Sequence, residues 1–512
     1  MSVRSAPVPS AAAADGWRPA DLAALAVVAL AGLLASLTQS LLIPVLPAIT
    51  RDLGSSSSGT QWLLTSTLLV AAVAVPVSGR LGDLYGKKTM LLACAAALTA
   101  GSLISALSHN LALMVAGRAV VGLSTGVVPL GISLLSTMLP PRRVASAIAL
   151  VSATLGIGGA LGVPLAAWIG EHADYHLLFW ITVAGGVVSV AGTWLLLSEP
   201  PARAAGRLDL PGTAVLAGAL VCLLLPLSQA AAWGWDSPAT IGLLAGAVVL
   251  LATFVAWERR SPSPLVDVVV NARPGLLLTN VASLCVGFAL FATLIGTASY
   301  VEAPAATGYG FGSSVVVGGL CLLPSGLAML LLSPVSAAIT NRFGPKVTLA
   351  LGAVIVALGF GVRIGFDARL WEIVAGTSIA GAGTGIAYAA MPSLIGRAAP
   401  RAELAAANGL NTLCRAVGSS LASAVGGTLF ASQLVLAGGA AFPSHGAYRL
   451  LFALCAGAAL LGAVIALTVP AHREAAGQPA GEPAGPDAAS PGPGAAGPDS
   501  AGAGPRYRSV PR

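Results

Sequence analysis

Charged residues are scarce in this 512-residue chain. Asp, Glu, Lys and Arg make up 9% of it, whereas a typical soluble domain is about a quarter charged. Hydrophobic residues make up 56%, so a soluble fold would lack the polar surface that keeps a domain in water. The composition therefore predicts an all-α membrane protein that crosses the bilayer many times. No polar stretch is long enough for a separate catalytic domain, and we expect no enzyme.

Patterns that bind cofactors are also missing. The chain has six cysteines, all inside apolar runs, and none stands in a C-x-x-C pair. This excludes a disulfide framework and the usual cysteine metal sites. A nucleotide-binding G-x-x-x-x-G-K-[ST] loop is absent too, which argues against ATP as an energy source within this chain. We expect no cofactor and no metal. The cysteines are Cys94, Cys222, Cys285, Cys321, Cys414 and Cys455.

Long apolar runs are what the chain has instead. A run of about 20 residues crosses ~30 Å of hydrocarbon, and we count fourteen such runs; twelve spans would result if the central pair were re-entrant. The first run lacks a cleavage site, so we expect it to be retained in the mature protein. The predicted spans are 22–45, 60–78, 89–108, 111–137, 144–169, 177–197, 212–231, 238–257, 275–300, 313–338, 346–366, 370–396, 404–435 and 448–469.

The net charge is +7. In a membrane protein the positive residues set the orientation in the bilayer, so we expect no nucleic-acid partner. Lys and Arg concentrate in the loops that follow even-numbered spans, which marks those loops as cytoplasmic. Both termini are then cytoplasmic, in a multi-pass protein of the inner (plasma) membrane. The even loops hold Arg80, Lys87, Lys88, Arg142, Arg143, Arg203, Arg207, Arg259, Arg260, Arg273, Arg342, Lys346, Arg397 and Arg401, and the odd loops hold Arg51, Arg363, Arg369 and Arg449.

One charged segment, residues 79–88 (GRLGDLYGKK), interrupts the apolar sequence. It resembles the G-x-L-x-D-x-x-G-r/k-k loop between helices 2 and 3 of the major facilitator superfamily. Glycines permit a tight turn at the bilayer surface, lysines stay in headgroup water, and Asp83 can pair with a cation or a helix N-terminus. We expect Asp83 to hold the cytoplasmic ends of two halves together in an outward-facing state. The residues assigned to this gate are Gly79, Gly82, Asp83, Gly86, Lys87 and Lys88.

Further segments resemble the fourteen-helix drug:proton antiporter branch of that superfamily, over roughly residues 20–470. Residues 61–65 (QWLLT) resemble its helix 2, and Arg118 with Gly122 resembles its helix 4 pattern. Gly158, Gly162 and Pro164 resemble its helix 5 signature, although Ala166-Ala167 replace the closing glycines. The resemblance implies export of drug- or antibiotic-like molecules with proton antiport by alternating access. It also implies that this helix belongs to the gate, whereas close packing alone would need the same small residues.

Two pairs of segments repeat along the chain. Residues 81–88 resemble 339–346, and residues 122–127 resemble 381–386. The repeat predicts two six-helix halves with a binding site between them near the bilayer midplane. We therefore divide the chain into a disordered cytoplasmic tail (1–18), an N-terminal half (19–200), two inserted helices (201–260), a C-terminal half (261–470) and a second disordered cytoplasmic tail (471–512). Both tails lack the large apolar residues that would offset ordering entropy.

Two arginines lie deep inside predicted spans. Arg118 is about seven residues, ~10 Å, from one end of its span, and Arg415 is about eleven residues, ~16 Å. A central Arg costs at least ~2.5–3.5 kcal/mol on insertion, so it faces a cavity or a partner. Around Arg415, Asn408, Asn411 and Thr412 recur at helical spacing, which favours a wet cavity; bonding to carbonyls of adjacent helices is the alternative for both arginines.

Embedded acids are absent. Where the resembled branch commonly carries an aspartate in helix 1, residues 37–41 read LTQSL, which leaves Gln39 as the polar candidate. Glu302, at the outer end of the ninth span, is the nearest acidic residue; it could carry the coupling proton or simply be solvated. Desolvated Arg attracts carboxylate and phenolate groups. We therefore expect neutral or weakly acidic substrates, such as polyketide-like antibiotics, to be preferred over permanent cations.

These observations predict a secondary transporter, with the proton gradient as energy source, that functions as a monomer. Its partners would be a small-molecule substrate, protons and the lipid bilayer. Two alternatives remain open: a metabolite importer or facilitator of the same fold, and a membrane sensor or scaffold that no longer transports. The sequence names neither the substrate nor the direction of transport.

Overall fold

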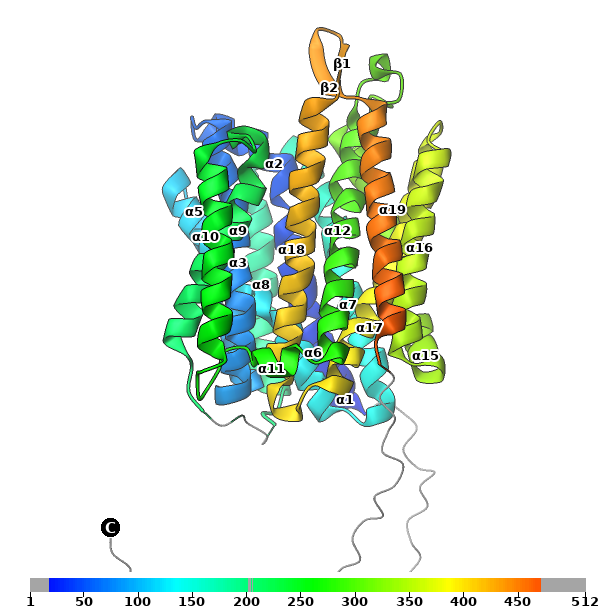
Figure 1. The fold of residues 1–512 in the computed structure, drawn as a ribbon. Helices are drawn as coiled ribbons and strands as arrows, with labels where there is room; N and C mark the ends of the chain where they lie inside the picture. The colour runs from blue at the N-terminus through cyan, green and yellow to red at the C-terminus, as the bar shows by residue number, and fades with distance from the viewer. Residues whose placement is uncertain (1–17, 201–203, 205, 471–512) are drawn as a thin grey trace, which may run out of the picture. The chain divides into compact units, whose positions relative to one another are not determined.

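A computed structural model describes residues 18–200, 204 and 206–470 (Figure 1). Apart from Arg18, the two tails predicted from composition lie outside the described residues, as does Arg203. The described residues form helices joined by short connections, with one β-hairpin. Helices are suited to a membrane, because each helix satisfies its own backbone hydrogen bonds where water is absent.

The first half of the described chain is a series of long helices. Their bounds are α1 (Pro19–Ser40), α2 (Leu42–Asp52), α3 (Ser57–Tyr85), α4 (Lys87–Ala106), α5 (Leu111–Gly122), the 3₁₀ turn η1 (Leu123–Gly126), α6 (Val127–Met138), α7 (Pro141–His172) and α8 (His176–Leu196). Two further helices, α9 (Leu210–Trp233) and α10 (Pro238–Glu258), follow.

The remaining elements make up the second half. They are α11 (Val268–Asn271), α12 (Pro274–Glu302), η2 (Ala305–Thr307), α13 (Val315–Leu320), α14 (Leu323–Leu331), α15 (Ser333–Phe343), α16 (Pro345–Gly365), α17 (Leu370–Ala398), η3 (Arg401–Glu403), α18 (Leu404–Ser432), β1 (Leu434–Ala437), β2 (Ala440–Pro443) and α19 (His445–Thr468). The strands β1 and β2 pair antiparallel between α18 and α19. Figure 1 shows this hairpin at the opposite end of α18 from α11.

Local sequence explains where several helices begin. The side chains of Ser56, Ser237 and Ser444 each accept a hydrogen bond from a backbone N–H in the first turn of α3, α10 and α19. Such capping satisfies donors that the helix itself leaves free. The turns into α4 and α16 are made by Gly86 (φ +121°) and Gly344 (φ +84°), a backbone conformation that residues with a Cβ rarely adopt.

The two segments that repeat in the sequence take matching places in the structure. Gly86 and Gly344 each end one helix and precede the next. Gly122 packs against the backbone oxygen of Thr67 in α3, and its counterpart Gly381 packs against that of Ser325 in α14. A Cβ at either glycine would lie 2.8 Å from that oxygen, so both helix pairs depend on the missing side chain.

The number of spans is close to the predicted one. Twelve helices of the described chain are long and apolar enough to cross a membrane, and the bent pair Val315–Leu331 and Ser333–Phe343 makes up to thirteen. The remaining predicted span, 275–300, lies in the 29-residue helix α12, where the apolar stretch found is Pro274–Leu290. A chain with this many apolar helices is a multi-pass membrane protein; fourteen spans stay a prediction.

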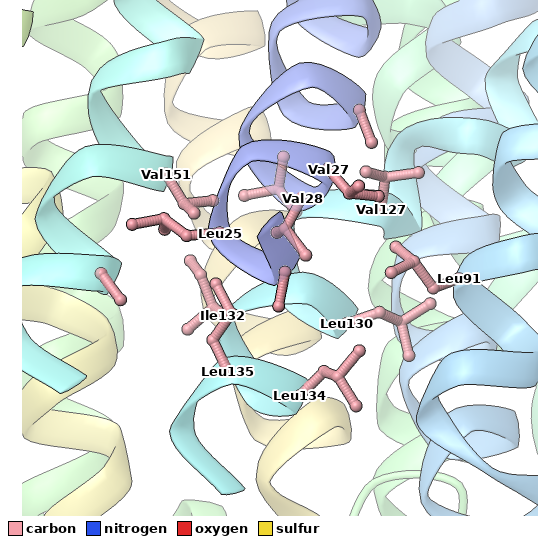
Figure 2. Close-up of a cluster of buried hydrophobic side chains, with 14 of the residues drawn as sticks. Leu25, Val27, Val28, Leu91, Val127, Leu130, Ile132, Leu134, Leu135 and Val151 are labelled. Carbon is pink, nitrogen blue, oxygen red and sulfur yellow. The ribbon is translucent and has the colours of Figure 1, made fainter. Parts of the chain in front are cut away.

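One core cluster joins α1, α4, α6 and α7 (Figure 2). Lipid tails are as apolar as leucine, so close packing, rather than exclusion from water, holds such helices together. The labelled residues Val28, Val127, Leu130 and Leu135 are all at most 3% exposed, which shows how tightly these helices meet.

The inserted helices do not form a separate unit. Helix α10 packs against α9, and α9 packs against both α3 and α18. One apolar cluster contains Leu216, Leu220 and Leu224 of α9 together with Ala72 of α3 and Leu413 of α18. The insertion therefore contacts both halves of the chain.

Candidate functional site

Two adjoining cavities lie between the halves. Their volumes are about 500 and about 520 Å³, the size of a pocket for a drug-sized molecule. We call them the first and the second cavity, and together the central cavity. Both are lined by Gln39 of α1, Thr125 of η1, and Thr412 and Ala416 of α18. Side chains from both halves thus meet around one space.

The central cavity reaches one end of the helices and stops short of the other. Along α3 its lining runs from Gln61, near the start of the helix, to Val75. Asp83 comes eight residues later, about 12 Å further at the rise of an α-helix. Exposed residues at the Gln61 end, such as Pro47 and Val315, belong to the lining. The cavity is therefore accessible from the end that carries Gln61.

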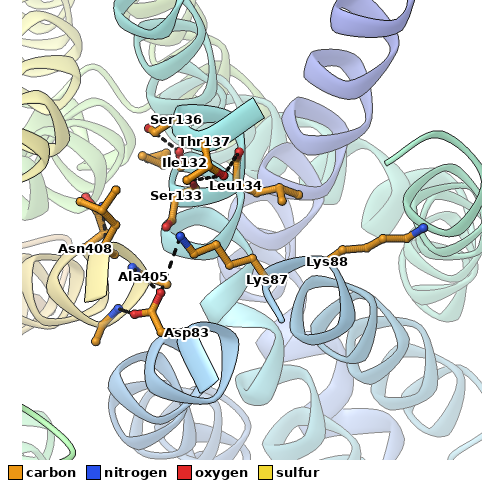
Figure 3. A network of polar contacts seen from close by, with 12 residues as sticks. Asp83, Lys87, Lys88, Ile132, Ser133, Leu134, Ser136, Thr137, Ala405 and Asn408 are labelled. Atoms are coloured by element: carbon orange, nitrogen blue, oxygen red, sulfur yellow. Dashed lines mark hydrogen bonds and ion pairs between the residues drawn. The ribbon is translucent and has the colours of Figure 1, made fainter. Parts of the chain in front are cut away.

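At the other end, Asp83 connects the two halves (Figure 3). Its two carboxylate oxygens accept hydrogen bonds from the backbone N–H groups of Ala405, at 3.2 Å, and Ala406, at 2.8 Å. These groups lie in the first turn of α18, whose own N-cap residue, Glu403, makes no side-chain cap. An acid at a helix N-terminus is stabilised by the helix dipole. The predicted pairing of Asp83 with a helix N-terminus is what the geometry shows.

The glycines of this gate act differently from the prediction. Helix α3 continues to Tyr85, so Gly79 and Gly82 are helical, and only Gly86 makes the turn. A Cβ on Gly79 would lie 2.6 Å from the backbone oxygen of Ala405, and one on Gly82 would lie 2.3 Å from Leu130. The absence of side chains at both positions lets α18 and α6 approach α3 closely. The loop predicted for residues 79–88 is therefore reduced to one residue, because α3 continues to Tyr85 and α4 begins at Lys87.

The two lysines also differ from each other. Lys87 is 2% exposed, with its Nζ 3.7 Å from the Asp83 carboxylate, so it does not lie in headgroup water as expected. The charge of Asp83 offsets part of the cost of burying that ammonium group. Lys88 points elsewhere and donates to the backbone oxygen of Trp194 at 2.9 Å. Glu199, which the sequence did not single out, accepts the backbone N–H of Lys88 and of Thr89 at the start of α4.

Arg118 lines the first cavity from α5 and is 2% exposed. Its guanidinium donates to the backbone oxygen of Thr38 in α1 at 3.1 Å, and its Nε is buried without a partner among the described residues. The sequence left two alternatives for Arg118, a place at a cavity or a bond to a carbonyl of an adjacent helix. The structure shows both. Arg118 therefore places positive charge at the wall.

Arg415 lines the second cavity from α18 and is 6% exposed. It donates to Thr412 at 3.0 Å and lies 4.5 Å from the ring centre of Tyr388, a cation–π distance. Its Nη1 is buried without a partner among the described residues. No carboxylate of the described chain forms an ion pair with Arg415, so the guanidinium retains its capacity for an anionic or hydrogen-bonding ligand.

The acidic content of the lining is small. Glu302, at the end of α12, is the one acidic residue among the described lining residues of the central cavity, and Gln39 lines both parts of it. Glu302 is half-buried, and its carboxylate lies next to Gly318 of α13. The central cavity thus combines two arginines, one carboxylate and neutral hydrogen-bonding groups.

Asn408 and Asn411 lie outside the lining of both parts of the central cavity. Asn411 donates to Asn280, at 3.1 Å, and to Ser283, at 2.6 Å, so it bonds α18 to α12. Asn408 donates to the backbone oxygen of Leu404 in its own helix. Of Asn408, Asn411 and Thr412, Thr412 is the one that lines the space, and Ser419 and Ser423 further along α18 line it as well. The polar face that α18 presents to the cavity therefore differs from the predicted one, because neither asparagine belongs to it.

Helix α7 packs against α1 of its own half and against α13, α14, α15 and α17 of the second half. Gly158 packs against the backbone of Leu33, and Gly162 packs against Ser40, both in α1. Pro164 faces the second half, where a Cβ on Gly319 of α13 would lie 2.7 Å from its nitrogen. The helix continues through Pro164 from Pro141 to His172. Close packing explains these three residues: the two glycines pack within the first half, and Pro164 packs against the second.

Arg363 is a buried residue whose position differs from the one predicted from the sequence. It was assigned to an outer loop, but it lies in α16, is 2% exposed, and donates to Thr297 and Thr377 at 2.9 and 3.0 Å. Its guanidinium also lies 4.5 Å from the ring centre of Phe452. The signal available was its position inside the apolar run 346–366. It does not line the central cavity, and its contacts join α16 to α12, α17 and α19.

Comparison with known proteins agrees with this geometry. A family model described as Major Facilitator Superfamily matches residues 28–325 and 281–501. The chain is 29% identical over 446 residues to the tetracenomycin C resistance and export protein of Streptomyces glaucescens, covering 85% of this chain and 81% of that protein. It is 31% identical over 425 residues to the "Probable actinorhodin transporter" of Streptomyces coelicolor, covering 80% and 72%.

A solved structure has the same fold. The crystal structure of the human organic anion transporter MFSD10 (TETRAN) matches with a TM-score of 0.62, covering 88% of this chain and 100% of that one. The sequences are 17% identical, so this similarity concerns the fold alone.

Among the described residues no group of three or more His, Cys, Asp or Glu is placed to hold a metal ion.

Proposed function

Because the chain belongs to the Major Facilitator Superfamily and is a transporter of that family, we propose that it exports antibiotic- or drug-like small molecules by alternating access. The observation that carries the proposal is the central cavity between the halves, accessible at the Gln61 end and closed at the Asp83 end. The charge distribution of the loops predicts that the Asp83 end is cytoplasmic. The structure then corresponds to an outward-facing state.

The direction of transport and its energy source are part of the proposal. The relative from Streptomyces glaucescens, whose name states resistance and export, supports export. The proton gradient is the energy source we propose, with Glu302 as the candidate proton carrier because it is the acidic residue of the lining. We propose that the protein acts as a monomer in the plasma membrane, since both halves of the cavity come from one chain.

The electrostatics favour certain substrates. Arg118 and Arg415 both border the central cavity, and neither forms an ion pair with a carboxylate of the described chain. Attraction between a guanidinium and an acidic group is strong where water is excluded. We therefore propose a preference for neutral or weakly acidic compounds over permanent cations.

A panel in a pump-deficient bacterial host tests this function. Cells with and without the protein are loaded with tetracenomycin C, actinorhodin or the cationic dye ethidium, and retained compound is measured. We expect the protein to lower the retained amount of at least one of the two antibiotics and to leave ethidium unchanged. A protonophore should abolish the difference. Equal retention of all compounds at verified expression would contradict export, and strong ethidium efflux would contradict the preference.

A further inference from the structure

The inserted helix α9 contributes side chains to the central cavity. Ser228 and Gln229 line the first cavity, next to residues of α3, α5 and α18. The insertion lies outside the duplicated halves in sequence, so a bipartite site would not include it. We propose that α9 is a third wall of the substrate site and that Gln229 is a specificity-determining residue, an inference that rests on the proposed export function.

The contacts of α9 with both halves keep it beside the cavity. Its apolar face packs against Ala72 of α3 and Leu413 of α18 in a single cluster. The two halves must move relative to each other in alternating access, and α9 contacts both. It therefore covers the side of the cavity where α3 and α18 would otherwise face lipid.

Side-chain and backbone bonds attach the insertion to both halves. At the Gln61 end, Trp235 after α9 donates its indole N–H to Thr428 of α18 at 2.6 Å. At the Asp83 end, the backbone N–H of Ala204 before α9 donates to the backbone oxygen of Asp83 at 2.7 Å. The insertion is thus bonded to the second half at one end and to the first half at the other.

Gln229 has hydrogen-bonding capacity that the protein does not use. Its side chain is buried, at 8% exposed, and no hydrogen bond between described residues involves its amide. Ser228, in contrast, donates to the backbone oxygen of Leu225 in its own helix. The residue lines the first cavity, where a ligand can supply its amide with both an acceptor and a donor. Compounds that carry carbonyl and hydroxyl groups fit this requirement.

Cysteine labelling tests whether α9 lines the cavity, independently of transport. Gln229→Cys is exposed to a charged thiol reagent in membranes open on both sides, and Val249→Cys on α10, where Val249 is 63% exposed, is the matched control. We expect labelling at position 229 above the background of the native cysteines, and none at position 249, because a thiol that faces lipid is not ionised. Absence of labelling at position 229 would overturn the third wall, whatever the protein transports.

Efflux tests the specificity. Gln229→Leu keeps the bulk and removes the amide, and Thr253→Val on α10 is the control, since Thr253 is exposed and bonds only its own helix. We expect Gln229→Leu to weaken export of tetracenomycin C or actinorhodin by about fivefold to tenfold, the effect of one lost hydrogen bond, and to change their ratio. An unchanged ratio and rate would overturn the role of Gln229 while export stands. A parent protein that exports neither antibiotic would overturn both the proposed function and this role, and labelling would still decide the wall.

Discussion

The carboxylate of Asp83 in α3 caps α18 by accepting the backbone N–H of Ala406 at 2.8 Å. The helix lacks a side-chain cap of its own, so a residue from one half completes a helix of the other. Gly79 allows this approach because its missing side chain leaves room for the backbone of Ala405. The contact can exist only while the halves meet at this end, so in the proposed alternating-access cycle we expect it to lock one state.

Asp83→Asn tests that lock. An amide oxygen can accept one of the two backbone hydrogen bonds, but its NH₂ group would face the other N–H, and Lys87 would lose its partner charge. Bonds to a charged group contribute about 1.5–3 kcal/mol, so we expect substrate flux to fall by about tenfold or more. The measurement is flux in proteoliposomes at matched protein amounts. Asp236→Asn, in the exposed α9–α10 connection, is the control, and equal flux in both variants would remove Asp83 from the mechanism.

Arg415→Ala tests the positive wall of the second cavity. Removing the guanidinium deletes the contact with Tyr388 and the charge that would attract an acidic group. We expect efflux of weakly acidic antibiotics to fall by about tenfold, a change of ~1.4 kcal/mol, and efflux of cationic dyes to stay low or rise. Retained dye and antibiotic are measured in the same cells. Strong efflux of quaternary cations by the parent protein, undiminished in the variant, would contradict the proposed preference.

Glu302→Gln tests the candidate proton carrier. Glu302 is the acidic residue of the described lining, and the variant keeps its size without a titratable proton. If it carries the coupling proton, export by the parent protein should vary with external pH and export by the variant should not. Glu171→Gln, in the last turn of α7 and exposed, is the matched control. Equal pH profiles for Glu302→Gln and the parent would place the coupling proton elsewhere.

Arg363→Ala tests a structural role away from the cavity. The substitution leaves a void between Phe452, Thr297 and Thr377. Large-to-small changes in a core cost about 2–5 kcal/mol, so we expect a lower Tm in detergent. Export per folded molecule should be retained, because the residue does not line the central cavity. Arg260→Ala, at an exposed position, should leave Tm unchanged, and a loss of export at normal Tm would assign Arg363 to transport.

Several features followed from local sequence. Apolar runs located the helices that cross the membrane, the glycine before Lys87 marked a turn, and the embedded Arg118 and Arg415 pointed to a cavity that both residues border. The helices follow from hydropathy summed over neighbouring residues. The cavity follows from the free-energy cost of one charged residue in an apolar run. Arg363 shows the limit of such local arguments. It lies near the end of an apolar run, so the sequence assigned it to a loop, but in the structure it is buried.

The sequence by itself determined that this protein is a bundle of membrane helices, because hydropathy is a local sum that neighbours in space do not alter. Which side chains face the central cavity was decided by the tertiary structure alone. Asn411 turns toward α12, Thr412 faces the cavity, and Gln229 of the inserted helix joins the lining. These outcomes depend on how each helix is rotated against its neighbours, and that rotation is set by contacts between residues far apart in the chain.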